Sequence, residues 1–153
     1  MSKLIRLAFT IWFIFSLLLL VSCSNVETIN EKVSSQLLAQ IKLRKEQIAD
    51  PIPDRIEIMK NMGMRTDNLK IQRVFIHLNK KLSQSQIEEI VAMEIILYLD
   101  SWIPPVGGHS TGFILADMPI DKLQALSEKD YVVRLDTAER LLEPQHGSQP
   151  QGR

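Results

Sequence analysis

Apolar and polar residues alternate along two stretches in the second half of the chain. Residues 71–78 and 94–102 both show a period of two, which is typical of strands with one buried face. Between them, Ser83 precedes Gln86 by three residues, the spacing of a capping box, and the apolar residues that follow recur at helical intervals. The pattern therefore predicts a strand, a helix and a second strand.

The rest of this half continues the alternation. Residues 103–110 contain Pro-Pro and Gly-Gly pairs, which indicate a loop, and residues 111–117 predict a third strand. Pro119 suits the first position of a short helix, and residues 131–135 predict a fourth strand. The complete order is β-α-β-β-α-β.

This order predicts an α+β fold of the ferredoxin-like class over residues 70–143, followed by a disordered tail over residues 144–153. Both helices follow a strand, so right-handed crossovers place them on one face of a four-stranded antiparallel sheet. The other face is left open. The alternation predicts that this open face carries Phe75, His77, Ile96, Tyr98 and Trp102.

An amphipathic helix is predicted before this domain. Apolar residues recur in steps of three and four from Val26 to Ile41, and Pro51 and Pro53 end the pattern. We interpret residues 23–69 as a lipid anchor, a spacer helix that lifts the domain off the membrane, and a linker. The apolar stripe must still be buried somewhere. Two alternatives stay open: the helix covers the open sheet face, or that face binds a partner.

Residues 1–22 have the three zones of a secretory signal peptide. Lys3 and Arg6 form a basic start, residues 7–21 are apolar, and Ser22 is small. An apolar run of this length is short for a membrane-spanning helix, which needs about 20 residues. We expect this segment to be removed.

The residues Leu20-Val21-Ser22-Cys23 resemble the bacterial lipobox, and Cys23 is the only cysteine of the chain. The resemblance implies cleavage before Cys23, a diacylglyceryl thioether on its sulfur and acylation of the new amine. Two or three acyl chains hold a protein durably on a bilayer, where one chain does not. By resemblance to lipoprotein sorting rules, Ser24 at the next position favours the outer membrane.

Charge and motifs point away from catalysis and nucleic-acid binding. The chain has 18 basic and 18 acidic residues, so it lacks the basic excess of a nucleic-acid-binding protein. The three histidines, His77, His109 and His146, are far apart in the sequence, and no serine lies in a Gly-x-Ser-x-Gly turn. No metal-ligand spacing is present. We expect no enzymatic activity, no metal and no cofactor.

Three segments resemble the propeptides of subtilisin-like proteases and the related I9-type inhibitors: Val74-Phe75-Ile76, Met118-Pro119-Ile120-Asp121-Lys122-Leu123 and Tyr131-Val132-Val133-Arg134-Leu135-Asp136. The resemblance covers about residues 71–143. It implies that the open sheet face binds two surface helices of a protease, and that the segment after the last strand enters the active-site cleft as a poor substrate. The residues of that segment expected to contact the protease are Glu139, Arg140, Leu141 and Leu142.

The sequence thus predicts a lipid-anchored cell-envelope protein whose ferredoxin-like domain binds a protein partner. On the sheet face, the residues expected to make the contact are Phe75, Ile96, Tyr98 and Trp102. The partner expected from the resemblance is a subtilisin-like protease, which the domain would inhibit or help to fold. The alternatives are a structural or assembly lipoprotein with no protease partner, and a sensor of a small ligand.

Overall fold

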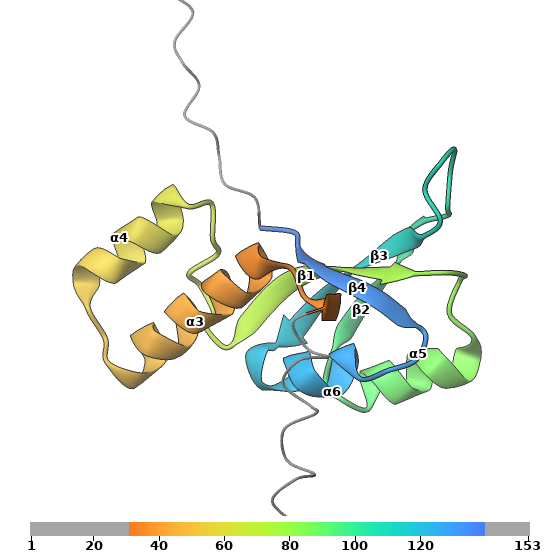
Figure 1. The fold of residues 1–153 in the computed structure, drawn as a ribbon. Helices are drawn as coiled ribbons and strands as arrows, with labels where there is room; N and C mark the ends of the chain where they lie inside the picture. Colours follow the sequence, from red (N-terminus) through yellow and green to blue (C-terminus); the bar gives the residue numbers. More distant parts are fainter. Residues whose placement is uncertain (1–30, 140–153) are drawn as a thin grey trace, which may run out of the picture.

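The computed structural model describes residues 31–139, and its helices and strands follow the predicted order (Figure 1). The elements are α3 (Ser35–Ala49), α4 (Pro53–Asn61), β1 (Ile71–Leu78), α5 (Gln84–Val91), β2 (Ile96–Ile103), β3 (Gly112–Pro119), η2 (Ile120–Lys122), α6 (Leu123–Ser127) and β4 (Val132–Thr137). The capping box at the start of α5 is present, with Ser83 and Gln86 each bonding the other's backbone N–H.

The four strands form one antiparallel sheet in the order β2-β3-β1-β4. This order, with α5 after β1 and α6 before β4, confirms the predicted α+β fold and is compatible with the ferredoxin-like class. β1 lies in the interior of the sheet between β3 and β4, which explains its regular alternation of buried and half-buried residues.

The hydrophobic core lies between the helices and one face of the sheet. Val74 and Ile76 of β1 pair with Ala116 and Ile114 of β3, and all four side chains are buried. The helices contribute Leu37, Ile41, Ile90, Leu123 and Leu126 to the same cluster. This face is the covered face of the sheet.

α3 packs against the covered face and belongs to the core, which differs from the expected spacer helix. Leu37 and Ile41 are buried in the common cluster, and Val33, just before the helix, bridges to Leu135 of β4 in a parallel arrangement. The helix also buries polar side chains, among them Arg44. The sequence prediction considered apolar positions only, so it did not include Arg44. The domain therefore includes α3.

Trp102 lies on the covered side of the sheet, so its predicted place on the open face was wrong. β2 pairs with β3 at Tyr98↔Leu115 and again at Ile103↔Phe113, so four residues of β2 stand opposite one residue of β3. This bulge shifts the alternation of side chains along β2. The Trp102 ring consequently packs beside the core residues Leu78, Leu82 and Ile114 and the partly buried Ile87.

Several sequence predictions concern residues outside the described range 31–139. They are the signal peptide, the lipidation of Cys23, the disordered tail and the contacts of Arg140, Leu141 and Leu142. Within the described range, no helix combines the length and the apolar character needed to span a bilayer.

Candidate functional site: the open face of the sheet

The face of the sheet opposite the core is not covered by any of the helices that the structure describes. It presents Arg73, Phe75 and His77 of β1, which alternate with the buried residues of that strand. Their partners on β3 are Asp117, Leu115 and Phe113, in that order. We call this surface the open face.

Aromatic side chains occupy the middle of the open face. The rings of Phe75 and Phe113 meet edge to face with centroids 5.0 Å apart, and the His77 ring lies 5.8 Å from that of Phe113. Beside them, Ile96 and Tyr98 of β2 are 60% and 37% exposed. Such a half-exposed aromatic and aliphatic centre is typical of the middle of a protein–protein interface.

A charged cluster borders this centre. The carboxylate of Asp117 accepts hydrogen bonds from Arg73 at 2.7 and 3.0 Å, from Arg65 at 3.3 Å and from the Tyr98 hydroxyl at 2.8 Å. These donors, above all Arg73, lower the pKa of Asp117 to about 2, and the same bond raises the pKa of Arg73. The Arg73 guanidinium also lies 5.4 Å from the centre of the Tyr98 ring, within cation–π range.

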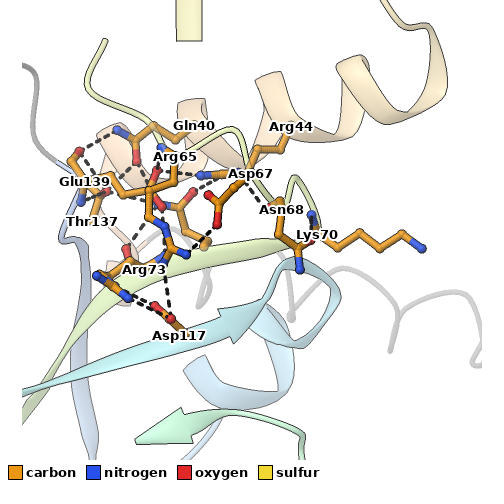
Figure 2. A network of polar contacts seen from close by, with 11 residues as sticks. Gln40, Arg44, Arg65, Asp67, Asn68, Lys70, Arg73, Asp117, Thr137 and Glu139 are labelled. Carbon is orange, nitrogen blue, oxygen red and sulfur yellow. Dashed lines mark hydrogen bonds and ion pairs between the residues drawn. The ribbon is translucent and has the colours of Figure 1, made fainter. Parts of the chain in front are cut away.

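On the side of α3, the carboxylate of Glu139 fixes the backbone that carries the arginines of this cluster. Its carboxylate accepts hydrogen bonds from the backbone N–H of Arg65 at 3.0 Å and of Arg73 at 3.2 Å, and from Arg44 Nη2 at 2.6 Å. Figure 2 follows this network from Arg44 on α3 across β1 to Asp117 on β3. The buried carboxylate of Glu139 therefore fixes the backbone at Arg65 and Arg73, the two arginines that bind Asp117.

The placement of Glu139 corrects its predicted role. Its side chain is 3% exposed and its partner Arg44 is fully buried, so the carboxylate is not free to contact a protease subsite. Gln40 and Thr137 bond the backbone of Glu139 as well. The sequence pattern placed Glu139 only in the segment after the last predicted strand and carried no sign of its distant partner on α3.

At the β4 side of the open face, Asp136 lies between the imidazole of His77 and the guanidinium of Arg134. Its carboxylate is 3.3 Å from His77 Nε2 and 2.9 Å from Arg134 Nε. Burial lowers the pKa of His77, and the positive charge of Arg134 lowers it further, while Asp136 acts in the opposite direction.

An open groove of about 490 Å³ continues from this point to the loop between β2 and β3. Its walls are partly apolar, with Ile103 45%, Val106 60% and Val133 36% exposed. The remaining lining residues are His77, Pro104, His109, Ser110, Thr111, Phe113, Arg134 and Asp136. The groove is large enough for one or two side chains of a partner, which fits a docking surface.

The structure brings together three of the four sheet-face residues predicted from the sequence, namely Phe75, Ile96 and Tyr98. Phe113 and Asp117 were not among the predicted site residues, although the predicted strand 111–117 contains both and its alternation would have placed them opposite the core. Among residues 31–139, no group of three His, Cys, Asp or Glu side chains is arranged to hold a metal ion.

Comparison of the chain with known protein families, with characterised proteins and with solved structures finds no match. The resemblance to protease propeptides therefore stays a prediction from the residues.

Proposed function

We propose that this protein is a lipid-anchored protein of the cell envelope whose open sheet face binds a protein partner. The observation that carries the proposal is the position of α3. This helix was the candidate cover for the open face, and its apolar residues Leu37 and Ile41 are buried on the opposite side of the sheet. The exposed Ile96 and Tyr98 thus remain without a cover among the described elements.

The chemistry of the open face supports a protein partner over a small ligand or a nucleic acid. Aromatic and aliphatic side chains form the centre, and charged residues form the border, as in many protein interfaces. The charges are paired with one another: Asp117 with Arg73 and Arg65, and Asp136 with Arg134. Since these arginines are all engaged by carboxylates, the surface has little free positive charge to attract a polyanion.

For the anchor, we propose a lipid on Cys23, as the lipobox-like residues imply, with the outer membrane as the location. Mass spectrometry of the mature N-terminus tests this part. A mass increase of diacylglyceryl plus acyl on Cys23 supports it, and an unmodified thiol would remove the anchor from the proposal.

A narrower proposal is that the partner is a subtilisin-like serine protease, inhibited or assisted in folding in the manner of I9-type proteins. The confirmed order of elements and the uncovered face support it. Because Glu139 is buried, the segment proposed to enter the protease cleft starts at Arg140 and includes Leu141 and Leu142. In the sequence, this segment directly follows Glu139, whose side chain is held by Arg44.

The test of the narrower proposal measures inhibition of a purified subtilisin-type protease by the chain without residues 1–22. Slow hydrolysis of the inhibitor together with inhibition at micromolar concentration is expected, and the variant Leu141→Asp with Leu142→Asp should lose it. No binding and no inhibition by the intact chain would leave the alternative, a structural or assembly lipoprotein that uses the same open face.

A further inference from the structure

The position of the lipid relative to the folded domain is set by the first described residues. Val33 is buried and bridges to Leu135, and the backbone N–H of Ser34 donates to the Leu135 carbonyl at 3.0 Å. One residue earlier, Lys32 Nζ donates to the carbonyl of Lys129 at 3.1 Å. The chain is thus fastened to the domain from Lys32 onward.

Only eight residues, Cys23 to Asn30, separate the proposed lipid from the start of the described chain. Even fully extended, eight residues span at most about 28 Å. The helix that the sequence pattern assigned as a spacer would have added about 30 Å, but it is packed in the core and adds nothing.

We propose that the domain is held within about 28 Å of the membrane surface, with β4 nearest to the lipid. Val33 adds to the outer side of β4, which is one edge strand, while β2 is the other edge. Three strand spacings of about 4.8 Å place β2 roughly 14 Å farther from the attachment side. The inference rests on the proposed lipidation of Cys23.

This geometry limits what the open face can reach. A domain of this size has a radius of gyration of about 13 Å and is thus roughly 35 Å across. Together with the tether, its far side extends at most about 63 Å from the bilayer. A partner that binds the open face of the anchored chain must therefore reach a docking surface within that distance of the bilayer.

The test measures the distance between the domain and the bilayer in the absence of any partner. The mature chain, residues 23–153, is coupled through the Cys23 thiol to a maleimide-bearing phospholipid in phosphatidylcholine vesicles that contain a dansyl-labelled headgroup. Trp102 serves as the donor for energy transfer, because the other tryptophan, Trp12, is in the segment removed. Chemical coupling replaces the cellular lipid, so the distance is measured even where lipidation in cells fails.

The matched control carries 30 Gly/Ser residues inserted between Ser24 and Asn25. A linker of this length adds an r.m.s. distance of about 30 Å. A second control, Cys23→Ser with Asp100→Cys, attaches the lipid on β2, two residues from Trp102, and gives the upper limit of transfer.

We expect the efficiency of energy transfer in the chain with the native tether to be at least twofold higher than in the linker variant. It should be lower than in the variant attached through β2. Equal transfer in the native and linker chains, or no transfer from the native tether, would overturn the inference. The vesicles contain no protein partner, so a failure of the open face to bind one would not affect this result.

Discussion

Arg44 of α3 and Glu139, just past the end of β4, form a buried ion pair with a distance of 2.6 Å between Nη2 and Oε2. The remaining polar atoms of the pair are satisfied by Gln72, the carbonyl of Asn68 and backbone N–H groups. The pair joins the beginning of the described chain to its end. It also places α3 on the covered face, which leaves the open face free.

Removing one member of this pair should destabilise the domain strongly. Arg44→Met leaves the Glu139 carboxylate buried without its charged partner, and we expect a loss of about 3–5 kcal/mol in the free energy of unfolding, measured with urea. The double variant Arg44→Met with Glu139→Met should recover most of that loss. As a control, Lys42→Ala removes an exposed pair with Glu46 and should change stability by less than about 0.5 kcal/mol. A loss below 1 kcal/mol for Arg44→Met would contradict the role given to the pair.

Replacing Gly112 should disturb the packing of Trp102. A Cβ on Gly112 would lie 2.6 Å from Trp102 Cη2 and even closer to the Ile103 carbonyl oxygen, whereas a Cβ on Gly108 would meet nothing within 4 Å. We expect Gly112→Ala to cost about 1–3 kcal/mol and to change the Trp102 fluorescence, with Gly108→Ala as the neutral control. Equal stability of the two variants would show that Trp102 is not packed over Gly112.

Acid should weaken the cluster around Asp117. Because its pKa is lowered from 3.8 to about 2 in the folded protein, the stabilisation is fully present above pH 4 and is lost as the pH falls toward 2. The contribution should be about 1–2 kcal/mol after allowance for solvent screening. The free energy of unfolding should therefore change less between pH 5 and pH 2.5 for Asp117→Asn than for the unchanged protein. The same difference in both proteins would exclude this explanation.

His77 should titrate below the usual histidine value of 6.5, because burial disfavours its charged form. Since the folded pKa is depressed, His77 contributes stability above the unfolded pKa that is lost as the pH falls through the folded pKa. NMR titration of the imidazole measures it directly. Two neighbours act in opposite directions, so Asp136→Asn should lower the pKa of His77 further and Arg134→Gln should raise it. Shifts of the same sign in both variants would contradict the arrangement.

The sequence pattern predicted the strands and their order well, because a period of two along β1 reports burial directly. It misplaced Trp102, since a bulge in β2 depends on how β2 pairs with β3 and leaves no mark in the alternation. It also missed the place of α3. A pattern of apolar residues treats Arg44 as solvent-exposed, and nothing local shows that Glu139, 95 residues later, neutralises it.

The candidate site was predictable to a similar extent. Phe75, Ile96 and Tyr98 lie on regular parts of strands, and the alternation placed them correctly. The charged cluster around Asp117 combines side chains from β1, β2, β3 and the segment before β1, a combination that only the folded chain reveals.

The central claim is that the open face binds a protein. It is tested most directly by a photo-crosslinking amino acid placed at Ile96 on the open face and, as a matched control, at the exposed Glu128 beside α6, in cells that carry the full chain. We expect position 96 to crosslink to one defined protein and position 128 not to do so. We also expect the purified pair to bind at least tenfold more weakly after Phe75→Ala with Tyr98→Ala, while the folding stability of the double variant is retained. Crosslinks of equal pattern from both positions, or unchanged affinity of a stably folded double variant, would contradict it.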